Sequence, residues 1–331
     1  FIPRIENLTT LIKENTELQE LEFYLGRILE GSKYLLSDNE EVLISKFTQT
    51  SSGAWGQLQG ELTSTLKVEY EGKEISLSEV RNFSSDNDPE VRRKGYEAEM
   101  KAYPKIAPSV AYALNGVKGE VNMLCELRGF ESALDQAVYQ SRMERSTLDA
   151  LIESMKDYLP HFLKYLKRKA ELLGHKNGLP YYDIFAPIGE SSKTFTEEEA
   201  MEFIYENFAT FGPEMEQLAR TAYKDEWIDF TPRMGKRGGA FCFNLHPIKQ
   251  SRIMTNFTGS FSNVITLAHE LGHAYHGDQI FKERITNSSY TMPVAETAST
   301  FCETIVKNAA LKDADKEEKI FILEQSLKGS T

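Results

Sequence analysis

Residues 264–277 read Val-Ile-Thr-Leu-Ala-His-Glu-Leu-Gly-His-Ala-Tyr-His-Gly, and this run decides how the rest of the chain is interpreted. His269 and His273 are four residues apart, so on an α-helix their imidazoles project from one face, a single turn apart, and both can reach one metal ion. Glu270 lies about 100° around the helix from His269, close enough to act on a water molecule at the metal without being a ligand. The apolar residues of the run recur at helical spacing, which predicts a packed helix.

A catalytic zinc ion usually takes three protein ligands and leaves one position for water, so the motif requires a third ligand. One class of zinc peptidase places a third histidine six residues after the second, but Gln279 is at that position here, and the class is excluded. Three later carboxylates are candidates: Glu283, Glu296 and Glu303. Glu283 lies between a lysine and an arginine, a pattern that is typical of a solvated charge cluster.

The other two carboxylates lie on one expected helix, residues 293–311. They are about 10 Å apart along its axis, so we expect only one of them to reach the metal. Glu296 is in the first turn, beside small residues that permit close helix packing, and we predict that it is the third ligand. Glu303 is interpreted either as a carboxylate that holds a ligand or a substrate group, or as a structural carboxylate. His276, two turns after His269, either orients substrate or packs at the rim of the site.

The composition is that of a globular protein with an acidic surface. The 331 residues include 38 Lys and Arg against 50 Asp and Glu, and the net charge of −12 argues against nucleic acid or an anionic membrane as the main partner. No uncharged apolar run approaches the roughly 20 residues that a membrane helix needs. Three cysteines lie far apart and form neither a disulfide framework nor a cysteine zinc site, so we expect a reducing compartment, the cytoplasm.

The patterning predicts a mainly helical chain in two parts. We expect an N-terminal helical sub-domain with a short hairpin over residues 1–80, and a catalytic domain over residues 81–331. The first part is expected to contain a helix over residues 8–29, a helix over 39–47, a break at 53–60 and a hairpin formed by 63–70 and 74–77. The second part is expected to contain helices that start at Pro89 and near Pro108, helices over 146–173 and 196–223, and strands over 238–245 and 253–257.

The residues around the motif also resemble those of a known protein family over a longer stretch. Residues 256–277, together with the run Pro293-Val-Ala-Glu-Thr-Ala-Ser-Thr-Phe-Cys-Glu303, resemble the oligoendopeptidase F branch of the thimet-oligopeptidase-like zinc peptidases. Residues 128–134, 182–187 and 238–242 also look like this family, so the likeness runs over most of the chain.

This resemblance implies a mainly α, zincin-like fold with a deep channel and a small β-sheet beside the zinc-binding helix. It implies that short peptides are hydrolysed by a zinc-activated water, with one Zn²⁺ held by His269, His273 and Glu296 and with Glu270 as the general base. It makes the segment Gly238, Gly239, Ala240 and Phe241 the edge strand that pairs with the substrate backbone.

Members of that family are considerably longer than this chain. We therefore expect the chain to be a fragment that lacks the C-terminal part of the catalytic domain. The group that stabilises the oxyanion is then expected beyond Thr331, and the remainder of the full-length chain is an expected partner. This leaves the activity of the fragment by itself open.

Two other interpretations remain. A helical metallocarboxypeptidase shares the motif and a distant glutamate, but it needs a positive group for the terminal carboxylate of its substrate. A non-catalytic peptide-binding protein with a structural zinc is the second. It is disfavoured because structural zinc sites usually have four protein ligands, whereas the sequence offers three good ones.

Overall fold

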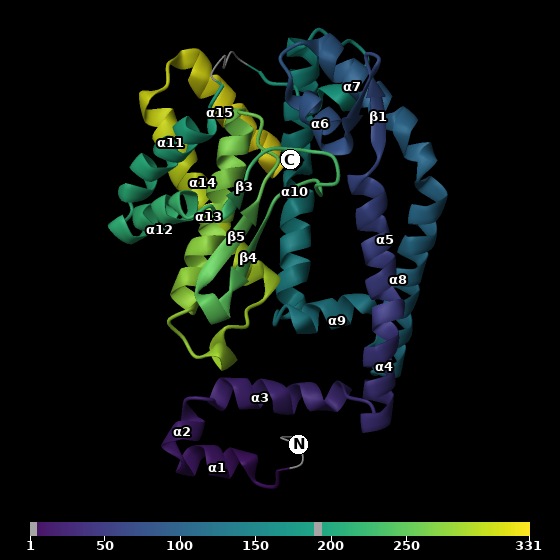
Figure 1. Ribbon diagram of the computed structural model, residues 1–331, viewed down its shortest axis with the longest axis vertical. Helices are drawn as coiled ribbons and strands as arrows, with labels where there is room; N and C mark the ends of the chain where they lie inside the picture. The colour runs from purple at the N-terminus through teal and green to yellow at the C-terminus, as the bar shows by residue number, and fades with distance from the viewer. Residues whose placement is uncertain (1–4, 189–193) are drawn as a thin grey trace.

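The computed structural model of the chain describes residues 5–188 and 194–331 and is mainly α-helical (Figure 1). The helices are α1 (Leu8–Glu14), α2 (Thr16–Gln19), α3 (Glu22–Gly31), α4 (Asp38–Thr50), α5 (Ser52–Ser64), α6 (Leu77–Asn82), α7 (Pro89–Ala102), α8 (Ala107–Leu127), α9 (Ala133–Gln140), α10 (Arg145–Leu172), α11 (Glu197–Ala209), α12 (Pro213–Lys224), α13 (Phe261–Ile280), α14 (Met292–Asp313) and α15 (Lys316–Ser330). The strands are β1 (Lys67–Tyr70), β2 (Lys73–Ser76), β3 (Ile228–Asp229), β4 (Phe241–Leu245) and β5 (Gln250–Met254). Among the described helices, none is both long and apolar enough to cross a membrane.

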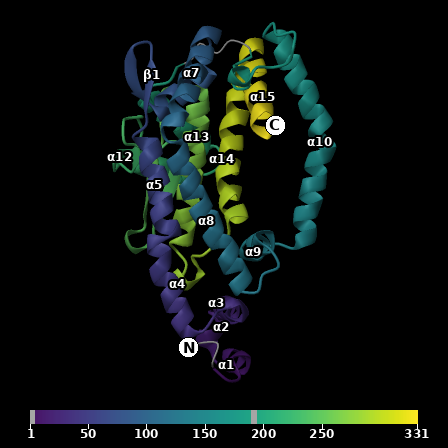
Figure 2. The ribbon, with the colours of Figure 1, turned by 90° about the vertical axis from the view of Figure 1, so that its right-hand side faces the viewer.

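The elements form two groups that differ in how tightly they pack. Helices α11 to α14 pack together on one side of a three-stranded sheet, which α13 contacts, and α15 lies beside α14 (Figure 1). On the other side, α4 and α5 follow one another and α8 runs back alongside them (Figures 1 and 2). Helix α10 then returns along the molecule and stands apart from its neighbours over most of its length (Figure 2).

Short polar signals start the helices that position the site. The predicted capping box at Thr196 and Glu199 is present at the start of α11, and Asp88 caps α7 ahead of Pro89, as predicted. A further capping box was not predicted. At the start of α13, the Ser260 side chain accepts from the Asn263 N–H and the Asn263 side chain accepts from the Ser260 N–H. This fixes the N-terminus of the helix that carries His269.

Two predicted long helices are wrong because local caps and breakers interrupt their apolar pattern. Residues 8–29 form three helices, since Asn15 is extended and its side chain accepts hydrogen bonds from the first turn of α2. Residues 196–223 form α11 and α12, because Gly212 is extended and Pro213 starts a new helix. The amphipathic spacing was real in both stretches, but it did not require a continuous helix.

The break predicted at residues 53–60 is also wrong, because these residues lie inside α5. Trp55 of this stretch packs against α8 at Gly116, and Gly60 leaves room for the Arg237 side chain. A Cβ atom on Gly116 of α8 would lie 2.5 Å from the Trp55 ring, and one on Gly60 would lie 3.0 Å from the Arg237 guanidinium. The hairpin is confirmed, although its first strand starts at Lys67 and not at residue 63.

The sheet beside α13 has the strand order β3-β5-β4, with β4 antiparallel and β3 parallel to β5. The strand predicted over residues 238–245 starts only at Phe241, and the second strand ends at Met254, before the predicted Phe257. Strand β3 was not predicted. A Cβ atom on Gly277 would lie 2.4 Å from the Asn244 side chain, so this glycine lets α13 approach β4 closely.

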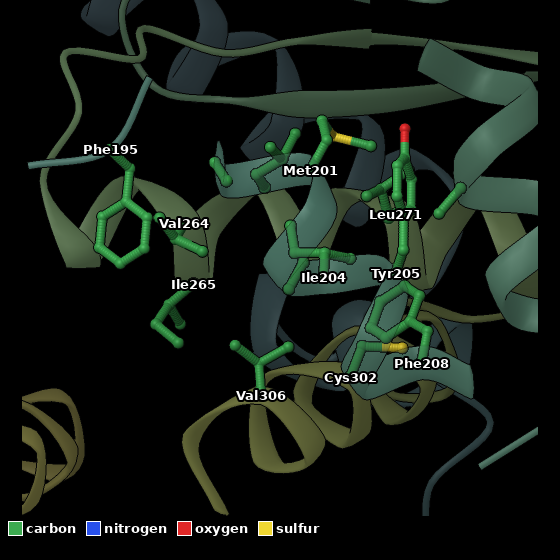
Figure 3. Packing of buried hydrophobic residues seen from close by; sticks show 14 of the residues in the cluster. Phe195, Met201, Ile204, Tyr205, Phe208, Val264, Ile265, Leu271, Cys302 and Val306 are labelled. Carbon is green, nitrogen blue, oxygen red and sulfur yellow. The ribbon is translucent and has the colours of Figure 1, made fainter. Parts of the chain in front are cut away.

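The largest apolar core surrounds α13 (Figure 3). Val264 and Leu271 from α13 pack with Phe208 of α11 and with Cys302 and Val306 of α14. A smaller cluster joins apolar residues from both sides of residue 80: Leu66, Val68, Leu77, Val80, Ala102 and Ile106. The division into sub-domains at that residue stays a prediction.

Candidate metal and catalytic site

The three predicted ligands meet where α13 and α14 pack together. The Nε2 atom of His269 lies 3.3 Å from Glu296 Oε2, and the Nε2 atom of His273 lies 3.5 Å from the same oxygen. The two imidazole rings are 4.8 Å apart between centroids and nearly perpendicular. One donor atom from each of the three residues therefore points at a shared position, and all three atoms lie within 4.8 Å of one another.

These separations have the size that a tetrahedral metal centre requires. Zinc bonds nitrogen and oxygen ligands at about 2.0–2.1 Å, so neighbouring ligand atoms on a tetrahedron are about 3.3–3.4 Å apart. The two distances from Glu296 match that spacing. Two neutral imidazoles and one carboxylate also form a donor set typical of catalytic zinc, with one position left for water. The residues present fit a zinc ion.

Gly272 explains why α13 and α14 can come so close. A Cβ atom at this position would lie 2.8 Å from the Ala298 carbonyl oxygen and 2.8 Å from the Ser299 Cα atom. Any side chain would push the helices apart and move Glu296 away from the histidines. Gly272 therefore contributes to the site by permitting the close approach of the two helices, although it has no side chain that could bind or react.

Glu303 contacts the His269 ring at Nδ1, the nitrogen that is not directed at Glu296. Its Oε1 lies 2.8 Å from His269 Nδ1, and its Oε2 accepts a 2.6 Å hydrogen bond from Lys307 Nζ. The bond to Glu303 raises the pKa of His269. Burial opposes the charge on Glu303, yet the bonds from His269 and Lys307 outweigh it and lower the pKa of this carboxyl. A hydrogen bond of this kind orients a ligating histidine and leaves Nε2 toward the metal.

The other two predicted ligands, Glu296 and His273, contact residues of α14. Ser299, which is fully buried, donates a 2.7 Å hydrogen bond to Glu296 Oε2. Burial lowers the pKa of His273, which favours the neutral ring that a metal needs, while a hydrogen bond with the Ala295 backbone acts in the opposite direction. Helix α14 thus supplies one of the three converging donors and contacts to both histidines of α13.

Glu270 follows His269 on α13 and is not one of the three converging donors. It is 5% exposed, and its Oε2 has no hydrogen-bond partner among the described residues. Burial raises its pKa to about 7. A carboxyl group with this pKa can both accept and donate a proton near neutrality, which is the property of a general acid–base catalyst.

A pocket of about 360 Å³ opens on one side of this cluster. It is lined by His269, Glu270, Glu303 and Lys307, by residues of the α13 N-terminal turns, by Ala240, and by Gln325, Lys328 and Gly329 of α15. A second pocket of about 210 Å³ shares Ala240 and Thr266 with the first and continues to Gly238, Gly239 and Arg81. The two pockets therefore adjoin along the segment before β4.

The segment predicted to pair with substrate adjoins these pockets, but most of it is not a strand. Only Phe241 belongs to β4, and β4 is an edge strand of its sheet. Gly238, Gly239 and Ala240 form the approach to it, where Gly239 has a positive φ of 81° and its carbonyl accepts a 2.8 Å bond from Asn256 Nδ2. Glycine suits this turn because φ is positive there.

His276 lies elsewhere on α13. Its ring is 4.5 Å from the Tyr290 ring, and it lines a pocket with residues of α14 such as Thr297 and Phe301. The pocket that contains Glu270 does not include His276. Its role in substrate binding stays a prediction.

Three contributors to the site were not predicted from the sequence: Ser299, Lys307 and Lys328. Lys307 had a local signal, because it follows Glu303 by four residues on one helix face. Ser299 was interpreted only as a small packing residue. Lys328 carried no signal, because it reaches the pocket only through the turn between α14 and α15.

Comparisons with known proteins found two family matches and several relatives of this chain. Residues 82–331 match peptidase family M3, and residues 5–67 match the family described as Oligopeptidase F. The chain is 24% identical over 333 residues to Oligopeptidase PepF of Bacillus subtilis, a match that covers 98% of this chain and 49% of the relative. It is 25% identical over 329 residues to Group B oligopeptidase PepB of Streptococcus agalactiae, covering 97% of this chain and 54% of the relative.

A crystal structure of a candidate oligoendopeptidase F from Bacillus anthracis has the same fold. It superposes with a TM-score of 0.81 at 17% identity, over 97% of this chain and 60% of that chain. The predicted fold class, mainly α with a small sheet beside the helix that carries the motif, is confirmed, and so is the family resemblance.

The chain belongs to peptidase family M3. It spans about half the length of the curated relatives that it matches.

Proposed function

We propose that this chain carries the metal centre of a zinc endopeptidase that hydrolyses short peptides. The observation that supports this most is the convergence of His269, His273 and Glu296 beside Glu270, whose free carboxylate oxygen is buried next to them. Two relatives are named as oligopeptidases, which supports short peptides as the substrate class.

In this proposal the chain's own residues hold the ion and move the proton. Zinc bound there supplies a Lewis acid that polarises a peptide carbonyl and makes water more acidic. Glu270 accepts a proton from the attacking water at Oε2 and then donates it to the leaving amine. Glu303 keeps the His269 ring oriented throughout, and Lys307 keeps Glu303 ionised.

The peptide is proposed to lie extended along Gly238–Phe241. The unpaired side of β4 supports this, because an edge strand can add a peptide strand through main-chain hydrogen bonds. Such pairing recognises the backbone of many peptides without selecting one sequence, as an enzyme that acts on mixed oligopeptides requires.

A metallocarboxypeptidase remains the second enzymatic candidate, since Lys328 could supply the positive group that it needs. A peptide with an amidated C-terminus separates the two, because only an endopeptidase cleaves it. A structural zinc is less favoured, because the described residues offer three converging donors and a pocket beside them.

Location and association belong to the same proposal. The three free thiols support a cytoplasmic location. Exposed apolar side chains along α10, including Leu151, Met155 and Leu159, support packing against further polypeptide of a longer chain. Labelling a Leu159→Cys variant tests this, since the thiol should react rapidly in this chain and slowly in a longer protein.

The decisive experiment measures zinc first and cleavage second. The protein should bind one equivalent of zinc by elemental analysis, and it should cleave an internally quenched peptide with a blocked C-terminus in a chelator-sensitive way. The assay should be run on this chain and on a longer protein that includes it. Chelator-insensitive cleavage, or binding of less than one equivalent, would overturn the proposal.

A further inference from the structure

Lys328 is a cation on the wall of the catalytic pocket. It lies on the last turns of α15 and lines the same pocket as His269, Glu270 and Glu303. Its ammonium group is 5.8 Å from the centre of the Phe185 ring. The side chain is half-buried and makes no ion pair within the described part of the chain.

The neighbouring charges leave the Lys328 ammonium group uncompensated. The carboxylate whose charge acts on Lys328 is that of Glu324, one turn earlier on α15. Glu324 already accepts a 2.5 Å hydrogen bond from Lys169 Nζ, which is fully buried, and a 2.5 Å bond from the Tyr165 hydroxyl. Two ammonium groups therefore share one carboxylate, while the other lysine of the pocket, Lys307, is matched by Glu303.

An unmatched ammonium group in this position is unfavourable. Burial lowers the pKa of Lys328 to about 8, with Glu324 opposing the shift and Lys169 adding to it. An anion that entered the pocket would supply the missing charge, and a carboxylate would also satisfy the ammonium hydrogen-bond donors.

We propose that Lys328 is a substrate-binding residue that holds a carboxylate of the peptide, either its free C-terminus or an acidic side chain. This deepens the proposed function and rests on it, because the group held in the pocket belongs to the peptide that is cut. Since Lys328 and Glu270 line one pocket, that carboxylate lies only a few residues from the scissile bond. A C-terminus held there would favour short peptides.

A binding measurement tests the role of Lys328 without turnover. The protein is the zinc-loaded Glu270→Gln variant, and the probes are the peptide Ala-Ala-Phe-Ala-Ala-Ala as free acid, the same peptide as C-terminal amide, and the amide with glutamate as its last residue. We expect the free acid or the glutamate amide to bind more tightly than the plain amide. Adding Lys328→Met should lower the affinity for the preferred probe about tenfold. The affinity for the plain amide should not change.

Three further variants make the result interpretable. Lys328→Arg should retain the preference, and Lys328→Gln should reproduce the loss if the methionine variant folds poorly. Lys319→Met, which removes an exposed lysine of the same helix, should change nothing. The probe that loses affinity identifies whether a terminal or a side-chain carboxylate is held.

Equal weakening of all three probes by Lys328→Met, or no preference for a carboxylate in the parent protein, would overturn the inference. So would failure of every probe to bind. Because binding is measured without cleavage, a protein that prefers carboxylates but cuts no peptide would instead refute the proposed function.

Discussion

Helices α13 and α10 are both long, but α13 is largely buried in the molecule and α10 is largely exposed. Ten of the 20 residues of α13 are buried, and they lie on more than one side of the helix. Of the 28 residues of α10, only Lys169 and Ala170 are buried, both near its C-terminal end. The helix that carries His269 and His273 lies in the core, while the longer helix has its buried residues only near one end.

The difference teaches that an amphipathic pattern predicts a helix but not its burial. Helix α10 has an apolar stripe, yet Leu151, Tyr158 and Leu163 remain 53%, 61% and 54% exposed because nothing described packs against them. Helix α13 is packed by the sheet on one side and by α11 and α14 on others. A site that must hold three donors within a fraction of an ångström requires that kind of support.

The largest expected effect concerns the metal itself. Replacing Glu296 with alanine should remove zinc and with it all peptidase activity, because two imidazoles alone leave the centre without its third protein ligand. Zinc content is measured by elemental analysis after dialysis. Glu303→Gln, which changes only the group behind His269, should weaken zinc binding by about 10–100-fold. Unchanged zinc in the Glu296→Ala variant would reassign the third ligand.

Glu270 provides a sharper test, because its removal should leave the metal in place. Glu270→Gln should retain zinc and lower turnover by about a thousandfold, the range expected for loss of a general acid–base group. Glu283→Gln, which changes an exposed glutamate beyond the end of α13, is the matched control and should keep full activity. Near-normal turnover in the Glu270→Gln variant would exclude this residue from proton transfer.

A pair of leucine truncations tests the contrast between the two helices directly. Leu267→Ala on α13 should lower the free energy of unfolding by about 2–5 kcal/mol, because Leu267 is fully buried. Leu159→Ala on α10 should change it by less than about 0.5 kcal/mol, because that side chain is 52% exposed. Urea unfolding measures both. Equal losses would mean that α10 is packed in solution.

A pair of glycine substitutions tests the close approach of α13 and α14 in the same way. Gly272→Ala should destabilise the protein by about 1–3 kcal/mol, because the new methyl group meets the backbone of α14. Gly119→Ala on α8 has open space around its Cβ position and should stabilise by about 0.5–1 kcal/mol through helix propensity. If Gly272→Ala is neutral and binds zinc normally, the two helices are less closely packed than described.

The smallest expected effect is a pH dependence of the stability of the protein that comes from Asp229. Hydrogen bonds from Arg233, and then from Lys236 against the opposing effect of burial, lower the pKa of Asp229 to about 2. Because the folded pKa lies below the unfolded value of about 3.9, this stabilisation is present above pH 4 and is lost as pH falls toward 2.

The Asp229 side chain is 43% exposed. We therefore expect its ion pairs to contribute less than about 1 kcal/mol to the free energy of unfolding. The comparison is urea unfolding at pH 5 and pH 3 for the parent protein and for Asp229→Asn. The parent should lose slightly more stability than the variant. A variant with the same pH response as the parent would show that Asp229 contributes nothing to it.

Local signals made part of this molecule predictable. The spacing of His269 and His273 follows from the helical period, and the start of α11 follows from the Thr196 capping box. The same reasoning failed at Asn15 and Gly212, where a cap or a breaker interrupts a stretch whose apolar spacing alone fits one helix. It also failed at residues 53–60, which continue α5 and place Trp55 against Gly116 of α8, and before Phe241, where a positive φ at Gly239 delays the start of the strand.

The amino-acid sequence by itself determined the donor types, their order along the chain and the helix that presents two of them, because these depend on residue identity and on a repeat of 3.6 residues. Only the tertiary structure decided that Glu296 faces both imidazoles, that Glu303 and Lys307 hold His269, and that Lys328 reaches the same pocket. Those relations join separate helices, and their geometry depends on how closely α13, α14 and α15 pack. No local pattern encodes that distance.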